Sequence, residues 1–303
     1  MRPTDRIDPR ARATSGITRL HRNDDGGWQA LAQDDTLAVE EPLEIRLQLA
    51  NPALPFGTNT AAQHTIAITM RTPGDDFELA VGFLLGEGIL RTRDDIEDVA
   101  YCLDPDEPQW QNIVTVSVRQ DLPFDAPSIQ RSFYTTSSCG ICGRAALDAL
   151  SLRGATSPPP SPTVSIDILT TLPARLRKEQ TIFESTGGLH AAGLFTSTGD
   201  LIDLREDVGR HNALDKLIGA QLQRGTLPLH NAILVLSGRA SYELLQKAVT
   251  VGIPIIAAVG APSSLAVEVA QTFNLTLLGF TRPASANIYS GAHRLTPATS
   301  SDA

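Results

Sequence analysis

Two cysteines spaced as Cys139-Gly140-Ile141-Cys142 are the residues of this chain best suited to chemistry. The run after them, residues 145 to 150, has the composition of a helix, so both thiols are expected in a polar loop close to a helix N-terminus. There the helix dipole and the guanidinium of Arg144 favour the thiolate, which is the nucleophilic form of cysteine. The motif therefore predicts a reactive thiol pair. Half of a zinc site and a chance pair are the alternatives.

A second group of candidate residues follows the strands of a predicted sheet. From residue 231 to residue 279 the chain reads β-α-β-α-β, and its strands are continuously apolar, as in a parallel sheet that is covered on both faces. Ligands of such sheets bind beyond the carboxyl ends of the strands. The segments at those ends are Ser237-Gly238-Arg239, Gly260-Ala261-Pro262-Ser263-Ser264 and Phe280-Thr281-Arg282.

These strand ends offer backbone N–H groups, hydroxyls and arginines, which together can hold a phosphate without a Walker motif. Helix capping by Ser241 and Ser263 is the alternative interpretation of each segment alone. Their coincidence on one sheet edge favours the phosphate site. Because the chain has a formal net charge of -9, an anionic ligand must be held by local basic groups of this kind.

Another dense polar cluster spans residues 206 to 212 and includes His211. It precedes an amphipathic helix predicted over 213–222. Arg210, His211 and Asn212 lie together at the start of this helix, and these residue types suit an anion or a heterocycle. The alternative is that Asp207 or Asn212 caps the helix while Arg210 forms an ion pair with Glu206 on the surface. His190, at the start of a further strand, is interpreted as a core or edge histidine.

Length and composition are those of an ordinary globular protein. With 303 residues, 42% of them hydrophobic, the chain can bury a real core in two domains or one large one. No segment approaches the roughly 20 apolar residues of a membrane span, and the negative charge argues against a nucleic-acid or membrane partner. Three cysteines cannot form a disulfide framework, so we expect a reducing, cytoplasmic location, with Cys102 in the core.

The pattern along the chain predicts an α+β N-terminal domain (28–130) followed by an α/β domain that contains the CxxC loop (131–295). The first 27 residues lack apolar periodicity and are expected to form a loose tail, as are residues 296–303. The proline-rich segment 158–162 is expected to be an irregular connector within the second domain.

Three strands and a helix are predicted in the N-terminal domain. Apolar residues alternate in the segments 43–49, 66–70 and 114–118, which is typical of half-buried strands. Asp75 and Glu78 have the spacing of a capping box, so a helix is expected from Phe77 to Leu85.

With these motifs in place, the sequence closely resembles the formate dehydrogenase accessory sulfurtransferase family, FdhD. The resemblance extends from about Pro42 to Gly291 and rests on several long motifs in one order. They are TMRTPGDD (69–76), SCGICG (138–143), TGGLH (186–190), EDVGRHNALDK (206–216), LSGRASYE (236–243), GAPSS (260–264) and NIYSG (287–291).

The resemblance implies that the protein accepts sulfur as a persulfide from a cysteine desulfurase. It then transfers the sulfur to the molybdenum bis(molybdopterin guanine dinucleotide) cofactor before the formate dehydrogenase catalytic subunit receives that cofactor. Cys139 matches the persulfide-forming cysteine of the family, and Cys142 matches its CxxC partner. The family also implies homodimers and a C-terminal domain like cytidine deaminase. No permanently bound metal is implied.

The cofactor-binding segment of the family matches Phe280-Thr281-Arg282-Pro283-Ala284-Ser285. We expect the guanine nucleotide end of the cofactor along the predicted sheet edge, with its phosphates near Ser237, Gly238 and Arg239, and with further contacts from Arg282 and His211. Many relatives have a glycine and a second arginine shortly after the position of Arg282, whereas this chain continues Pro283-Ala284-Ser285-Ala286. Part of the anion contact of the family is therefore missing.

Three other functions share some of these sequence features. A thioredoxin-like oxidoreductase would carry its CxxC early in a small fold, with tryptophan before the motif and proline inside it, and both are missing. A zinc deaminase needs H-x-E together with P-C-x-x-C, and neither half matches. A non-enzymatic chaperone that binds the molybdenum cofactor stays open, because carrying sulfur and carrying cofactor would use the same surfaces.

Overall fold

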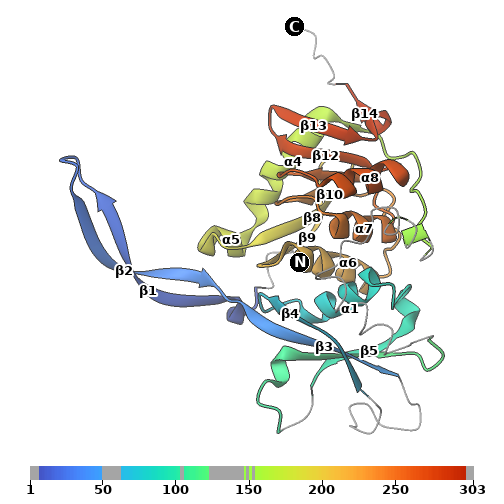
Figure 1. Ribbon diagram of the computed structural model, residues 1–303, viewed down its shortest axis with the longest axis horizontal. Helices are drawn as coiled ribbons and strands as arrows, with labels where there is room; N and C mark the ends of the chain where they lie inside the picture. Colours follow the sequence, from blue (N-terminus) through green and yellow to red (C-terminus); the bar gives the residue numbers. More distant parts are fainter. Residues whose placement is uncertain are drawn as a thin grey trace.

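Apolar alternation produces the smaller of the two main sheets. The computed structural model describes residues 7–49, 63–102, 106–122, 147, 150–151 and 154–297 (Figure 1). The small sheet has the order β4-β3-β6-β5, with β3 parallel to β6 and antiparallel to β4. Its strands are β3 (Glu41–Leu49), β4 (Gln63–Arg71), β5 (Ile96–Tyr101) and β6 (Ile113–Val118). The three strands predicted for this part of the chain are confirmed.

Helix α1 (Asp76–Gly86) covers the buried face of this sheet, as the sequence predicts, but its first turn differs from the prediction. Asp75 is the N-cap residue in a left-handed conformation, with φ 55°, and its side chain accepts no capping hydrogen bond. Glu78 instead accepts a hydrogen bond of 2.9 Å from Nη2 of Arg205. The expected capping box is therefore wrong, because a tertiary ion pair takes the carboxylate that would have closed it.

The larger sheet has six strands in the order β13-β12-β11-β10-β8-β9. Its strands are β8 (His190–Phe195), β9 (Leu201–Asp207), β10 (Ile233–Leu236), β11 (Ile255–Ala258), β12 (Thr276–Arg282) and β13 (Ser285–Ser290). β10, β11 and β12 are parallel, whereas the strands on either side pair antiparallel with them. The predicted β-α-β-α-β unit is thus confirmed as the centre of a mixed sheet.

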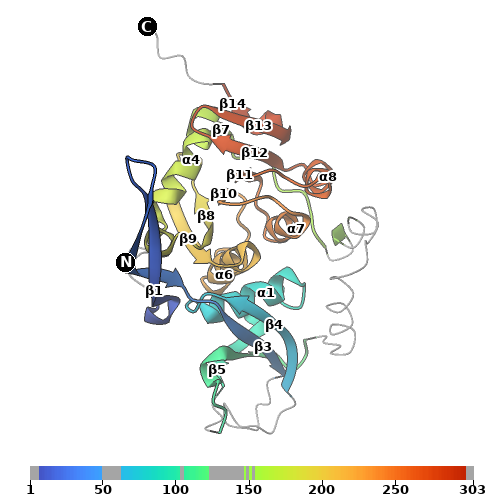
Figure 2. The same cartoon turned by 60° about the vertical axis from the view of Figure 1, so that its left-hand side comes forward.

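Helices cover both faces of the larger sheet (Figure 2). They are α4 (Ile166–Glu179), α5 (Thr181–Thr186), α6 (Arg210–Gln223), α7 (Tyr242–Thr250) and α8 (Ser264–Thr272). Alternate residues of β10 point to opposite sides: Ile233 and Val235 share a core with α4, whereas Leu234 and Leu236 share one with α6 and α7. Burial on both faces is why these strands read as continuous apolar runs.

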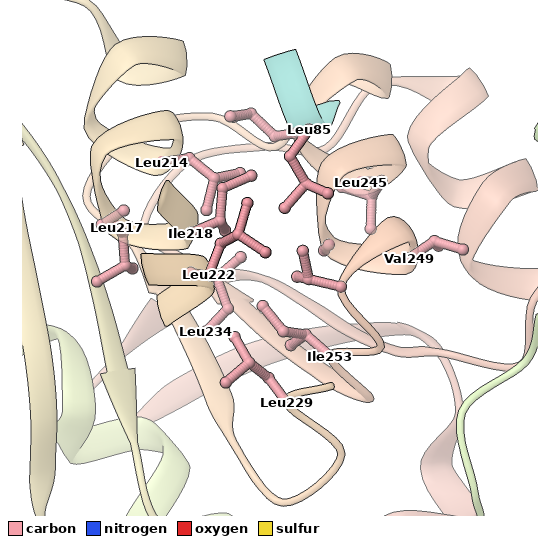
Figure 3. Close-up of a cluster of buried hydrophobic side chains, with 14 of the residues drawn as sticks. Leu85, Leu214, Leu217, Ile218, Leu222, Leu229, Leu234, Leu245, Val249 and Ile253 are labelled. Carbon is pink, nitrogen blue, oxygen red and sulfur yellow. The ribbon is translucent and has the colours of Figure 1, made fainter. Parts of the chain in front are cut away.

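The second of these cores continues into the small sheet and joins the two halves of the chain. Leu85 of α1, Leu214 and Ile218 of α6, and Leu245 of α7 lie in one cluster (Figure 3). α1 and α6 approach closely where Gly82 faces Gly219, since a Cβ atom on Gly82 would lie 2.9 Å from the amide nitrogen of Gly219. The small sheet therefore shares one continuous core with the α6–α7 face of the larger sheet, whereas the α4 face has a core of its own.

Strands β1 (Arg12–Arg22) and β2 (Trp28–Ala38) form a long hairpin that projects from the two sheets (Figure 1). All 11 residues of β1 pair in continuous register with β2, so the expectation of a loose tail up to residue 27 is wrong. Side chains on both faces of the hairpin are largely exposed, and neither strand therefore shows the apolar alternation by which a half-buried strand is recognised.

The remaining described elements are short. They are β7 (Val164–Ser165), β14 (Leu295–Thr296) and 3-10 turns at Pro9–Ala11, Arg93–Asp95, Trp110–Asn112 and Ala292–Arg294. The proline-rich segment 158–162 is irregular, as predicted. Cys102, expected in the core, is only half-buried. The predicted domain boundary at residue 130 lies outside the described residues, and the likeness to cytidine deaminase stays a prediction. None of the helices described is both long and apolar enough to cross a membrane.

Candidate functional site

The three predicted strand ends lie side by side at one edge of the larger sheet. The backbone ladder continues beyond the strands, with hydrogen bonds of 2.9 Å from Gly260 N to Gly238 O and 3.1 Å from Phe280 N to Gly260 O. Farther out, Ala240 pairs with Pro262 as an isolated parallel bridge. The segments that start at Ser237, Gly260 and Phe280 therefore form one continuous rim.

Ser237 and Gly238 shape the centre of this rim. The Ser237 hydroxyl accepts a hydrogen bond of 2.8 Å from the amide of Ala191, so it ties β10 to β8. A Cβ atom on Gly238 would lie 3.3 Å from Nδ1 of His190 and 4.0 Å from Cδ of Arg210. The missing side chain thus lets both of these residues approach the backbone of the rim.

The outer part of the rim presents basic and aromatic side chains. Arg239 and Arg282 are exposed, and Phe280, in a left-handed conformation with φ 51°, is 40% exposed. Thr281 between them is only 1% exposed, and its hydroxyl oxygen has no hydrogen-bond partner in the described structure. The rest of the predicted binding segment is exposed: Pro283 and Ala284 form the turn from β12 into β13, and Ser285 is the first residue of β13.

His190, predicted to be a core or edge histidine, and Arg210, predicted only as part of the polar cluster 206–212, belong to the same rim. β8 runs antiparallel to β10, so its first residue lies at the carboxyl edge of β10, and α6 begins there as well. The Nε atom of Arg210 is buried and makes no hydrogen bond within the described part of the chain. Burial and, next, the charge of Arg210 lower the pKa of His190 from its ordinary 6.5, although Asp207 opposes them. A buried, unpaired guanidinium N–H beside an imidazole is a suitable place for an anion.

The polar cluster 206–212 has a mainly structural role. Asp207 is fully buried, forms an ion pair of 2.7 Å with Lys216 and accepts a hydrogen bond of 3.1 Å from the amide of Thr72. Asn212 donates to the carbonyl of Met70 at 2.7 Å. Both residues therefore fasten α6 to β4 and the segment after it. The alternative that either residue caps α6 with its side chain is wrong, since the N-cap residue is Gly209 and no side chain caps it.

Glu206 and His211, from the same cluster, point to different partners. Glu206 accepts hydrogen bonds from the amides of Ile182 and Phe183, at 3.0 and 2.8 Å, so it does not form the surface ion pair considered for the cluster. His211 lies 3.0 Å from the Ser241 hydroxyl and 3.4 Å from Glu243. The hydrogen bond from His211 holds the pKa of Glu243 down at about 2. His211 is therefore engaged at the start of α7, beside the rim.

Cys139 and Cys142 lie outside the described residues. Leu147 and Leu150, a few positions further on, are helical, and Leu150 is buried in the core that α1, α6 and α7 share. This agrees with the helix expected after the CxxC motif. Among the residues that the structure describes, no group of three or more histidine, cysteine, aspartate or glutamate side chains could hold a metal ion.

Comparison with known proteins places this geometry in a family. Residues 55–296 match the model of the FdhD/NarQ family. The chain belongs to the FdhD/NarQ family. The FdhD/NarQ match covers both sheets from β4 onward and the rim, but it does not include the β1–β2 hairpin.

Curated FdhD/NarQ proteins are similar over most of the chain. A protein named sulfur carrier protein FdhD from Streptomyces avermitilis is 50% identical over 265 residues, which are 86% of this chain and 89% of that protein. Its namesake from Sulfurisphaera tokodaii is 43% identical over 87% of this chain and 92% of that protein. The solved structure of a proposed formate dehydrogenase accessory protein from Desulfotalea psychrophila has the same fold. Its TM-score is 0.67 at 22% identity, covering 94% of this chain and all of that one.

Proposed function

We propose that this protein is a sulfurtransferase that carries sulfur as a persulfide on Cys139. A cysteine desulfurase supplies the sulfur, and the molybdenum bis(molybdopterin guanine dinucleotide) cofactor, bound as a substrate, receives it before insertion into the formate dehydrogenase catalytic subunit. The names of the curated relatives support the sulfur-carrier role, and the CxxC motif supplies a suitable nucleophile. The reduced state of such thiols suits the cytoplasm, and a homodimer is part of the proposal.

The two cysteines divide the chemistry between them. The Cys139 thiolate attacks the terminal sulfur of the desulfurase persulfide, and the desulfurase cysteine leaves as a thiolate, with no net oxidation. Release of that sulfur as sulfide requires two electrons. Attack by the Cys142 thiolate supplies them by forming a Cys139–Cys142 disulfide, which a cellular dithiol then reduces. Cys142 thus resolves the persulfide, and its loss should leave loading intact.

The single observation that carries the cofactor site is the rim itself. In an acidic chain, the Arg239 and Arg282 side chains, the Gly238 backbone and the Arg210 guanidinium, whose Nε atom is buried, lie at one edge of a parallel unit. Phosphates of the guanine nucleotide end bind at such edges. Arg210 and His190 provide positive charge and hydrogen bonds where the sequence lacks the second arginine that many relatives have after Arg282.

Sulfur loading tests the carrier role. The full chain is incubated with a cysteine desulfurase and L-cysteine, and its intact mass is measured without reductant. We expect a gain of one sulfur atom that Cys139→Ser abolishes, whereas Cys142→Ser and the matched control Cys102→Ser retain it. Undiminished loading of the Cys139→Ser variant would refute the assignment of the carrier cysteine.

Nucleotide binding tests the rim independently. GDP is titrated calorimetrically into the full chain and into Arg239→Ala and Arg282→Ala. We expect each substitution to weaken binding by about tenfold, because a charge-assisted hydrogen bond to phosphate contributes about 1.5–3 kcal/mol in a partly exposed site. Arg91→Ala, an exposed arginine after the carboxyl end of α1, is the control and should bind like the parent. Binding that is the same in all four proteins would refute the site.

A further inference from the structure

The β1–β2 hairpin presents an apolar face that the described structure leaves uncovered. Its base is anchored to α5, since Arg12 donates a hydrogen bond of 3.1 Å to the carbonyl of Thr181. Beyond the base the strands extend away from the two sheets (Figure 1). A two-stranded hairpin in water is marginally stable at best without a packed face. The outer half therefore calls for a partner surface.

The register of the strands defines which side chains share that face. Residues directly opposite each other point to the same side, and alternate pairs share a face. One face of the outer half, here called the arm face, consists of the pairs Arg22–Trp28, Leu20–Ala30, Thr18–Ala32 and Gly16–Asp34. All eight residues are exposed, and Trp28 and Leu20 have exposed fractions of 68% and 61%.

Charge is distributed along the arm face in a way that selects its partner. Arg22 lies at the end near the hairpin turn, Asp34 lies at the end near the base, and the side chains between them are uncharged. Neither the Arg22 side chain nor the Asp34 side chain has a hydrogen bond or ion pair in the described structure, although both residues pair through their backbones in the hairpin. A second arm face that runs in the opposite direction would bring Arg22 of each copy to Asp34 of the other.

The shape of the arm face also fits this arrangement. Gly16 leaves a hollow in the arm face beside Asp34, since a Cβ atom on Gly16 would meet nothing within 4 Å. In two antiparallel faces that are centred between Leu20 and Thr18, Arg22 lies over Gly16 of the other copy, where this hollow has room for its long side chain. The apolar side chains then cover each other in the middle.

We propose that the arm face is a docking surface for a second copy of this chain, stacked face to face and antiparallel around a two-fold axis. The inference rests on the homodimer of the proposed function and names the surface that forms it. Two-fold symmetry provides the Arg22–Asp34 contact twice. The antiparallel arrangement also places the sheet-containing parts of the two acidic chains at opposite ends of the stacked hairpins. Because salt screens charges over about 8–10 Å, the repulsion between these two parts is weak. The arm lies outside the segment that the family model matches.

Charge reversal tests this geometry. The full-length parent and its variants are compared by sedimentation velocity over a range of concentrations. Arg22→Glu and Asp34→Arg should each weaken dimerisation by roughly tenfold, because each replaces two attractive contacts with two repulsive ones. The double variant Arg22→Glu/Asp34→Arg should recover the affinity of the parent. Glu40→Arg, an exposed charge reversal outside the hairpin, is the control and should leave the dimer unchanged.

The contradicting outcomes are equally definite. A parent that is monomeric throughout, single variants that dimerise like the parent, or a double variant that does not recover would each overturn the proposal. Single variants that stay dimeric but no longer activate formate dehydrogenase would show that the arm docks a different protein, which also overturns it. Sulfur loading of Cys139 is measured on the same preparations. If loading fails while the charge reversals behave as expected, the proposed function is wrong and the arm interface stands.

Discussion

Replacing Gly82 with alanine should destabilise the whole chain, because α1 and α6 are in backbone contact at this residue. A Cβ atom there would lie 2.9 Å from the amide nitrogen of Gly219 and still closer to the carbonyl oxygen of Asp215, whereas ordinary contact begins at 3.4 Å. Backbone atoms in two packed helices cannot rotate aside as a flexible side chain can. The helices must therefore separate.

The expected cost follows from this clash. A separation of about 1 Å is enough to forfeit a quarter to a half of the dispersion energy between the facing atoms. Overpacking of this kind costs about 1–3 kcal/mol, and a rigid backbone contact belongs at the upper end. Alanine is more favourable than glycine within a helix by about 0.5–1 kcal/mol, which offsets part of this cost. We therefore expect a net loss of about 2 kcal/mol, and a melting temperature lower by about 4–8 °C.

Differential scanning calorimetry of Gly82→Ala measures this loss directly. Gly188→Ala is the matched control, since a Cβ atom there meets only the Cβ of Ala38 and the carbonyl of Thr186 at ordinary distances, 3.4 and 3.9 Å. The control should melt within about 1 °C of the parent, as surface substitutions usually do. A Gly82→Ala variant that melts with the parent would show that the two helices do not touch here, and the continuous core would then be wrong.

Three further outcomes are expected. The pKa of Glu243, measured by NMR, should lie near 2 and return toward its ordinary value of 4.5 in the His211→Ala variant. The stability that the ionised Glu243 side chain adds is present above pH 4.5 and lost as the pH falls toward 2. A pKa that is unchanged in the variant would contradict the contact between His211 and Glu243. GDP affinity measured by calorimetry should rise as the pH falls into the range where His190 becomes protonated, because the phosphate favours the charged imidazole. The His190→Gln variant should lose this rise, and a rise that persists in the variant would come from another group. Lys247→Met should lower the free energy of unfolding, measured in urea, by about 3–5 kcal/mol, because Asp215 stays buried without its ion pair. Adding Asp215→Asn to this variant should restore most of the lost stability. A double variant that is no more stable would exclude the Lys247–Asp215 ion pair.

The parallel unit and its rim could be predicted because burial leaves a clear pattern in the sequence. Strands that are covered on both faces, such as β10 and β11, are continuously apolar, and the helices between them restrict the order of the strands. Once the strands are in order, their carboxyl ends must lie together. The contiguity of Ser237, Gly260 and Phe280 follows from that rule alone.

The hairpin and the polar cluster could not be predicted in the same way. β1 and β2 expose both faces, so neither has a buried side to give the alternation that identifies a strand. Asp207 looks like a ligand or capping residue locally, but its buried partner, the amide of Thr72, is 135 positions away in the chain. One sequence without its tertiary contacts cannot distinguish a structural carboxylate from a functional one.

The position of His190 and Arg210 on the rim could not be predicted for a related reason. A single histidine at the start of a strand is more often structural, and only the antiparallel pairing of β8 with β10 brings it to the rim. The glycine pair before His190 and the Gly209–Arg210 step at the start of α6 were the available signals. Both stand next to element boundaries, where close approach to a ligand is common.

The most direct test of the sulfur-carrier account is a single-turnover transfer. Persulfide-loaded protein, freed of desulfurase and cysteine, is mixed with inactive formate dehydrogenase that holds sulfur-free cofactor, and formate oxidation is measured against the amount of persulfide added. The account predicts activity in proportion to the persulfide, with none from unloaded protein or from loaded samples stripped by a thiol reductant. Equal activation by loaded and unloaded protein would contradict it and would identify a cofactor chaperone instead.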